Sequence, residues 1–496
     1  MNCHINPKRV LGSIDPKIYG HFLEHFHRQI YGGVFDPTSP FADDDGLRTD
    51  VIEALRAIRV PILRWPGGCF VSSYNWKKAV GPVRTPVYDK AWRVEDPNTF
   101  GTDEFIRLCR KIGCEPYICT NAGTGTAEEM SDWVEYCNLE HEGEYARLRI
   151  ANGHPEPYNV KYWSIGNENY GFWEIGAKKS GEWSHFVTES AKMMRHVDPG
   201  LQLSAASLDD PDWNLKLLQQ AGDQLRWLSI HDYWDTIHEV YKPASYEGAM
   251  GLTALLDSKI RKIRGTLTML GLADRIKIAF DEWNLRSWHH PNIHRNLEAG
   301  TSRELYVTPR DRNDTNSTYT TADSVFAACF LNTCIRNCDM VKMANFAPAV
   351  NTTGVLFTHA NGIVRRSTYY VFLLLANLMG NQAVDLWTED APVETINGTQ
   401  IPLLDLTAAM RTRDGALTIS AANKHDCLPQ ELVLQLGCHE GTRAVLHCVT
   451  GESRDAYNDI DREQVSIHTQ ALPMERGTLR LTLPPHSANL IEILCD

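Results

Sequence analysis

Short apolar runs alternate with helix-like segments along the first three quarters of the chain. An apolar run of about four to eight residues that ends in Gly, Pro or Asn predicts a buried strand, whereas apolar positions spaced three to four apart predict a helix. The predicted strands are Ile18–Phe22, Pro61–Trp65, Glu115–Thr120, Tyr162–Ile165, Gln202–Ala206, Trp227–His231, Ile276–Trp283 and Val341–Phe346. The predicted helices are 47–58, 102–112, 127–138, 180–197, 213–221, 252–270 and 321–337. Eight strands separated by helices predict an α/β fold, a parallel sheet closed into a (β/α)8 TIM barrel.

The pattern changes in the last quarter of the chain, from about Leu403 onward. Short β-rich runs follow one another there without a helix of useful length between them, as in Ala416–Ser420, Glu431–Leu434, Arg443–Val449 and Leu479–Leu483. Such a series predicts an antiparallel, jelly-roll-like β-sandwich. Chain ends often lie close together, so the first residues can add a strand to it. We expect a barrel domain of residues 15–375, and a sandwich domain that combines residues 1–14 with 376–496.

Charge and composition narrow the possible partners. The formal net charge of −13 argues against nucleic acid and anionic membranes, which both attract basic surfaces. The chain has no uninterrupted apolar window of about 18 residues, so we expect no membrane span. The N-terminus lacks the apolar region of a signal peptide, and the 13 Cys lack metal-ligand spacing. These features favour a cytoplasmic protein with reduced thiols.

Two of the predicted strands end in a carboxylate. Glu168 closes the run after Gly166 and Asn167, and Glu282 closes the seventh strand. The carboxyl ends of barrel strands meet at one mouth, where barrel enzymes carry their sites. An isolated Glu is more often a solvated surface residue, but both of these follow apolar strands and lie near Trp. A pair of carboxylates supplies the acid and the nucleophile of glycoside hydrolysis, and the Asn167 amide can bind a sugar hydroxyl.

These motifs resemble those of the α-L-arabinofuranosidases of glycoside hydrolase family 51, which are retaining barrel glycosidases. The likeness extends over nearly the whole chain and includes Gly20–His25, Tyr31–Gly33, Arg64–Gly68, Tyr74–Trp76, Asn98–Gly101, Gly166–Glu168 and Phe280–Asn284. The resemblance implies that Glu168 is the acid/base and Glu282 the nucleophile. It implies that Glu24 and Asn167 bind arabinose hydroxyls. It also implies a homo-oligomer, commonly a hexamer, and no cofactor or metal.

Other positions carry more than one interpretation. By resemblance Tyr233 contacts the nucleophile and the sugar ring, and Trp92 walls the pocket, although Trp92 is equally typical of core. Cys69 follows the Pro-Gly-Gly turn at a substrate-binding position where the resemblance implies Asn, so it bears on substrate preference. Arg64 is expected to orient carboxylates, and His231 to form hydrogen bonds within the mouth. Glu24 could instead form an ion pair with Arg28, four residues away on the same loop. The patch Trp288–His290 fits either a pocket rim or a subunit contact.

The resemblance implies a retaining, exo-acting α-L-arabinofuranosidase, which releases terminal arabinose from arabino-oligosaccharides or arabinoxylan fragments by double displacement. A β-xylosidase or endo-glucanase of the same clan is an alternative, because such enzymes carry the same carboxylates. His25 and His27 after the first strand are also typical of metal-dependent amidohydrolase-type barrels, although the other metal ligands are incomplete here. A barrel that only binds sugar is the third alternative.

Overall fold

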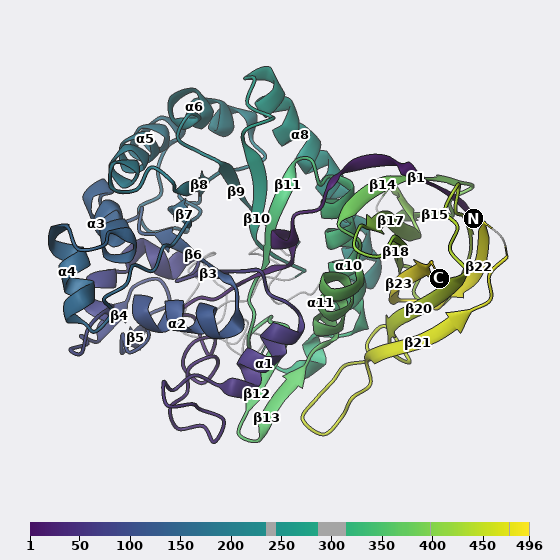
Figure 1. Cartoon of the computed structure of the whole chain (residues 1–496), viewed down its shortest axis with the longest axis horizontal. Coiled ribbons are helices and arrows are strands. Elements are labelled where there is room, and N and C mark those ends of the chain that lie inside the picture. The colour runs from purple at the N-terminus through teal and green to yellow at the C-terminus, as the bar shows by residue number, and fades with distance from the viewer. Residues whose placement is uncertain (235–244, 286–313, 397, 476, 496) are drawn as a thin grey trace, which may run out of the picture.

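The computed structural model describes residues 1–234, 245–285, 314–396, 398–475 and 477–495. Within these ranges, eight parallel strands close into a barrel in the order β10-β11-β2-β3-β6-β7-β8-β9. Their bounds are β2 Gly20–Phe22, β3 Ile62–Trp65, β6 Glu115–Thr120, β7 Tyr162–Ile165, β8 Gln202–Ala206, β9 Trp227–Tyr233, β10 Lys277–Asn284 and β11 Val341–Phe346. Each of the eight predicted strands is represented, so the predicted barrel is confirmed (Figure 1).

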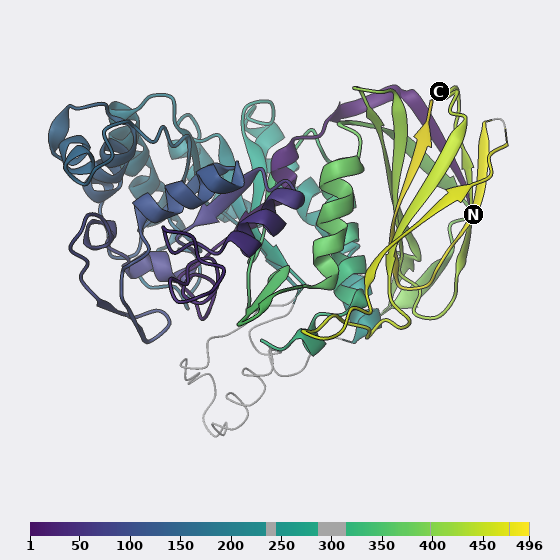
Figure 2. The same cartoon turned by 60° about the horizontal axis from the view of Figure 1, so that its bottom comes forward.

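Helices surround the barrel strands (Figures 1 and 2). They are α1 Thr49–Ala57, α2 Thr102–Ile112, α3 Ala127–Asn138, α4 Gly143–Ala151, α5 Ser180–Val197, α6 Pro211–Ala221, α7 Tyr246–Leu252, α8 Leu255–Met269, α10 Thr321–Arg336 and α11 Ser367–Leu378. Local capping sets several of these bounds. The backbone N–H of Glu129 donates a hydrogen bond to the Thr126 hydroxyl, and the backbone N–H of Thr126 donates one to the Glu129 carboxylate. This reciprocal pair begins α3.

Several elements differ from the predictions. Ile18 and Tyr19 belong to a 3-10 helix, η1 Pro16–Tyr19, because the Asp15 carboxylate caps it by accepting the amide of Lys17. The helix predicted over 252–270 is present as α8 Leu255–Met269, and the separate helix α7 Tyr246–Leu252, which precedes it, was not predicted. Helices α4 and α11 were not predicted.

The predicted sandwich is confirmed as one long, mostly antiparallel sheet that folds over its own apolar core (Figures 1 and 2). In the described residues its strand order is β21-β20-β23-β18-β17-β14-β1-β19-β22. The bounds are β1 Asn2–Ser13, β14 Gln382–Glu389, β17 Leu404–Arg411, β18 Ala416–Asn423, β19 Gln430–Gln435, β20 Arg443–Thr450, β21 Ser466–Leu472, β22 Thr478–Leu483 and β23 Ser487–Leu494. The N-terminal strand β1 pairs antiparallel with β14 and parallel with β19, so the start of the chain joins this sheet.

Three short antiparallel hairpins project from this framework. They are β4 Val87–Asp89 with β5 Val94–Asp96, β12 Leu356–His359 with β13 Gly362–Arg365, and β15 Val393–Ile396 with β16 Thr399–Pro402. Further 3-10 turns are η2 Cys69–Ser73, η3 Trp76–Ala79 and η5 Asn316–Thr318.

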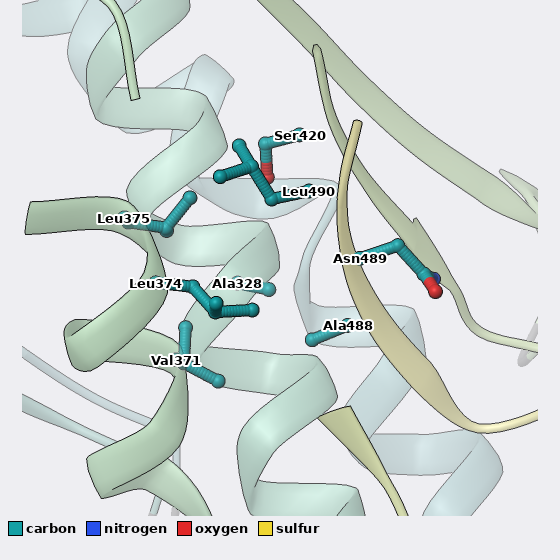
Figure 3. A pocket seen from close by; sticks show the side chains of 8 residues that line it. All are labelled: Ala328, Val371, Leu374, Leu375, Ser420, Ala488, Asn489 and Leu490. Carbon is teal, nitrogen blue, oxygen red and sulfur yellow. The ribbon is translucent and has the colours of Figure 1, made fainter. Parts of the chain in front are cut away.

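Helices α10 and α11 lie between the barrel and the sandwich sheet (Figure 1). Val371, Leu374 and Leu375 of α11 face the strands of that sheet across a small cavity of about 10 Å³ (Figure 3). Leu490 of β23 lines its other side. The barrel and the sheet are therefore joined by close apolar packing. No helix in the described part of the chain is both long and apolar enough to cross a bilayer. The division at residues 14/15 and 375/376 stays a prediction.

Candidate active site

Glu168 follows β7 on a tightly turned backbone. Gly166 has φ +70°, and a Cβ atom there would lie 2.0 Å from the side-chain oxygen of Asn169, so this position requires glycine. Glu168 itself has φ +45°, which a non-glycine residue adopts at an energetic cost and mostly where function requires it. The Gly-Asn-Glu sequence therefore ends the strand and directs the Glu168 carboxylate into the mouth of the barrel.

Glu282 reaches the same mouth from β10. Strand β10 pairs with β9 so that Glu282 lies opposite His231 and Asn284 lies opposite Tyr233. The register between these two strands is irregular just before Glu282. An irregularity of this kind re-aims the side chains that follow it. As a result, Arg64 approaches two successive carboxylates, with its Nε 3.6 Å from Asp281 Oδ2 and its Nη1 2.9 Å from Glu282 Oε2.

The two carboxylates predicted from the sequence lie next to each other. One oxygen of Glu168, one oxygen of Glu282 and one ring nitrogen of His231 all lie within 4.8 Å of one another. His231 Nδ1 is 2.8 Å from Glu168 Oε1 and 3.5 Å from Glu282 Oε2. Retaining glycosidases hold their two carboxyl groups about 5–5.5 Å apart, and inverting ones hold them farther apart. The spacing here suits attack by one carboxylate on a sugar held between the pair.

Donors from opposite sides hold Glu282 in place. Arg64 Nη1 donates to Oε2, and the Tyr233 hydroxyl donates to Oε1 at 2.8 Å. Arg64 Nη2 donates to the side-chain oxygen of Asn167 at 2.8 Å, so the same guanidinium also fixes the residue before Glu168. Arg64 is fully buried, and such charge-assisted hydrogen bonds are among the stronger ones in proteins. The structure therefore places Arg64 where the sequence predicted it, among the carboxylates.

His231 and Glu168 shift each other's protonation. Burial lowers the pKa of His231, but the charges of Glu282 and Glu168 outweigh burial and raise the pKa to about 8. Burial raises the pKa of Glu168, but the hydrogen bond and charge of His231 together hold the pKa below its usual value. Trp173 Nε1 also donates to Glu168 Oε2 at 2.7 Å. A proton near Glu168 is thus available on the adjoining imidazole around neutral pH.

Glu24 and Trp92 form the opposite side of the site. Trp92 Nε1 and the Phe70 amide both donate to Glu24 Oε1, at 2.8 and 3.0 Å. Burial, followed by the charge of Glu282, raises the pKa of Glu24 to about 8. A Cβ atom at Gly68 would lie 3.3 Å from Glu24 Oε2 and 3.4 Å from Glu282 Oε2, so both carboxyl groups border the space that a side chain at this position would fill. Glu24 is therefore a neutral acid below about pH 7 and can both donate to and accept from a sugar hydroxyl.

Cys69 lies beside two carboxyl groups, of which only one was predicted as a site residue. The Cys69 sulfur, one oxygen of Glu168 and one oxygen of Glu174 lie within 4.8 Å of one another. Sequence reasoning did not single out Trp173 or Glu174, because neither ends a strand nor follows a periodic pattern. Their position a few residues after Glu168 was the only available signal.

Several alternatives from the sequence are not seen. Arg28 donates to the backbone carbonyls of Gly32 and Thr358 rather than to Glu24. His25 Nδ1 lies 2.7 Å from Asp96, and neither His25 nor His27 belongs to either group of potential metal ligands in the described residues. Within the described residues, His25 and His27 are therefore not part of a ligand set of the kind that the metal-dependent interpretation requires. Residues Trp288–His290 lie outside the described residues.

Comparison with known proteins agrees with this geometry. Residues 54–249 match the family model for the α-L-arabinofuranosidase 1 domain, and residues 281–487 match that for the α-L-arabinofuranosidase C-terminal domain. A probable α-L-arabinofuranosidase C of Aspergillus niger is 32% identical, with 98% of this chain and 96% of that protein covered. An intracellular exo-α-(1→5)-L-arabinofuranosidase of Halalkalibacterium halodurans is 30% identical, with 97% of each chain covered. The solved structure of the GH51 α-L-arabinofuranosidase of Thermotoga petrophila superposes with a TM-score of 0.84 at 35% identity, over 99% of both chains.

This chain belongs to the family 51 α-L-arabinofuranosidases. The resemblance stated from the sequence motifs is confirmed, and the protein is a glycoside hydrolase. Family membership also explains why the barrel and the sandwich occur together, because the two family models match successive parts of one chain.

Proposed function

We propose that this family 51 α-L-arabinofuranosidase is exo-acting and retains the anomeric configuration, with Glu282 as nucleophile and Glu168 as acid/base. The observation that carries the proposal is the approach of these two carboxylates to within 4.8 Å at the carboxyl ends of β7 and β10. Such a short spacing leaves no room for a water molecule to attack from the face opposite the leaving group.

The residues around the pair suit the two steps of a double displacement. Glu282 attacks C1 of a terminal arabinofuranose, while Glu168 passes to the departing oxygen a proton that the adjoining His231 imidazolium supplies. The bond from C1 to the leaving oxygen breaks, and a glycosyl ester forms on Glu282. Glu168 then takes a proton from water, which attacks C1 and releases arabinose and free Glu282. Arg64 and Tyr233 hold Glu282 in line through both steps.

Neighbouring side chains suit recognition of the sugar. Asn167 Nδ2 has a second N–H besides the one that Glu174 accepts, and a hydrogen bond from it to a sugar hydroxyl would strengthen as positive charge develops at C1. Glu24, held by Trp92, lies across the site and offers hydrogen bonds to other hydroxyls. We assign Cys69 to the same wall of the pocket, where its small, weakly polar thiol bears on substrate preference.

We propose short arabino-oligosaccharides and arabinoxylan fragments as substrates, and the cytoplasm as the location. The Halalkalibacterium halodurans relative supports both points, because it is named as an intracellular exo-α-(1→5) enzyme. We also propose a homo-oligomer, with the hexamer expected from the family. The molar mass of the purified protein, measured by light scattering, tests whether it is a hexamer.

The mechanism is tested with two variants and one control. Glu282→Ala should lose about 10³-fold or more in kcat on nitrophenyl arabinofuranoside. Glu168→Ala should keep the most activity on good leaving groups and should recover rate with azide, giving arabinosyl azide. Glu53→Ala, an exposed position on α1, should behave as wild type. A lack of azide rescue, or NMR detection of a product with inverted configuration, would refute the catalytic assignment. Turnover of nitrophenyl xyloside or glucoside faster than that of nitrophenyl arabinofuranoside would refute the substrate class.

A further inference from the structure

Glu174 is a third carboxyl group at the site, and the mechanism above does not use it. Its residue is 4% exposed, so it is a buried acid rather than a surface one. Glu174 Oε2 accepts a hydrogen bond of 3.3 Å from Asn167 Nδ2. Asn167 Oδ1 meanwhile accepts from Arg64, which fixes which end of the amide faces Glu174. A continuous chain of hydrogen bonds thus runs from Glu282 through Arg64 and Asn167 to Glu174.

Glu174 also lies beside the acid/base. One of its oxygens, one oxygen of Glu168 and the Cys69 sulfur lie within 4.8 Å of one another. Glu174 Oε1 is buried and has no hydrogen-bond partner among the described residues. We propose that Glu174 is a positioning residue, which orients Asn167 and shares with Glu168 the proton that is given to the leaving oxygen. This inference rests on the proposed role of Glu168.

The surroundings of Glu174 favour a shared proton. Burial, with a smaller contribution from the charge of Glu168, raises the pKa of Glu174 to about 7. Burial raises the pKa of the Cys69 thiol well above its usual value, and it does the same for the Tyr170 hydroxyl. Both of these neighbours therefore stay neutral near pH 7. The group also contains two cations, His231 on the other side of Glu168 and Arg64, which bonds to Asn167.

When two carboxyl groups lie this close, their protons are lost in two steps, and each apparent pKa describes the pair rather than one residue. While Glu174 is ionised, its negative charge opposes loss of the last proton from Glu168 and from His231. Without that charge, the last proton leaves at a lower pH. The carboxyl group of Glu174 therefore extends the activity of the enzyme toward higher pH, in addition to holding the amide of Asn167.

The test is the pH profile of kcat/KM on an arabino-oligosaccharide, whose poor leaving group requires the acid. Glu174→Gln keeps the shape and the acceptor for Asn167 but removes the charge, so its basic limb should move to lower pH by about one unit. Glu174→Asp keeps the charge at a greater distance, so its basic limb should lie between that of Glu174→Gln and that of the wild type. This second variant also carries the test if Glu174→Gln does not fold.

An unchanged basic limb in both variants would overturn the proposal. That outcome differs from failure of the proposed function, which would show as an absence of azide rescue in Glu168→Ala. A purely structural role for Glu174 would lower kcat/KM by the same factor at every pH, and this result would also overturn the shared proton. Thermal melting at pH 6 confirms that each variant is folded before its profile is measured.

Discussion

The ion pair between His231 and Glu168 should give this enzyme a pH-dependent stability that His231→Asn removes. The pair joins Nδ1 to Oε1 at 2.8 Å, and the His231 side chain is only 4% exposed, so solvent screens it little. Asn can keep one hydrogen bond at this position but carries no charge. The difference in unfolding free energy between wild type and variant should therefore change with pH.

The sign and size of this change follow from the two pKa shifts. His231 has a folded-state pKa raised from 6.5 to about 8, so its stabilisation is complete below pH 6.5 and is lost as the pH rises through 8. A shift of this size is worth about 2 kcal/mol, since each pKa unit corresponds to about 1.4 kcal/mol. Glu168 has a lowered pKa, so its stabilisation is present above pH 4.5 and is lost at lower pH. The pair therefore contributes most between pH 4.5 and 6.5.

Urea unfolding of wild type and His231→Asn at half-unit steps from pH 5 to 9.5 measures this difference directly. The unfolding free energy of wild type minus that of His231→Asn should be about 2 kcal/mol larger at pH 6 than at pH 9. His141→Asn is the matched control, because the His141 side chain is 70% exposed. A difference between wild type and His231→Asn that stays constant across this range would refute the charged pair, whatever its absolute size.

Three further substitutions probe the walls of the site, each assayed on nitrophenyl arabinofuranoside. Tyr233→Phe removes the hydrogen bond to the Glu282 carboxylate and should lower kcat/KM by about 10- to 100-fold; a wild-type value would show that this bond does not assist attack. Trp92→Phe removes the donor that holds Glu24 and should raise KM about tenfold with little change in kcat, whereas a loss confined to kcat would contradict a binding role. Glu24→Gln imitates the protonated acid and should stay within about threefold of wild-type kcat/KM at pH 6; a loss of 100-fold would show that the ionised form is needed.

The barrel and the sandwich could be predicted because their strands carry local signals. Each barrel strand is a short apolar run with a clear stop, and no special side chain is needed to recognise it. The predictions went wrong where side chains bond to the local backbone. Asp15 begins a 3-10 helix at Pro16 and thereby shortens the first strand. Such bonds depend on geometry that hydrophobic periodicity does not express.

The site was predictable to the extent that its residues end strands. Glu168 follows β7, Glu282 lies near the end of β10 and Tyr233 ends β9, and the barrel topology alone brings these strand ends together. Glu174 could not be found this way, because it follows β7 through a turn whose path is set by Gly166 and by the left-handed backbone of Glu168. The folded backbone of this turn brings the Glu174 carboxyl group back beside Glu168, and hydrophobic periodicity does not predict that path. Residues that support others thus escape sequence reasoning more readily than residues that end strands.

The contrast between the surroundings of the two carboxylates argues for their separate roles. Glu282 receives donors at both oxygens, from a buried guanidinium and from a phenol, and this arrangement suits a group that must attack as an anion. Glu168 instead contacts His231 and lies beside Glu174, and both of these groups titrate near neutral pH. An acid/base must gain and lose a proton in every cycle, so titratable neighbours suit it better than a fixed cation. Exchanging the two roles would give the proton donor the direct hydrogen bond of Arg64, which at present bonds to Glu282 and acts on Glu168 through its charge alone.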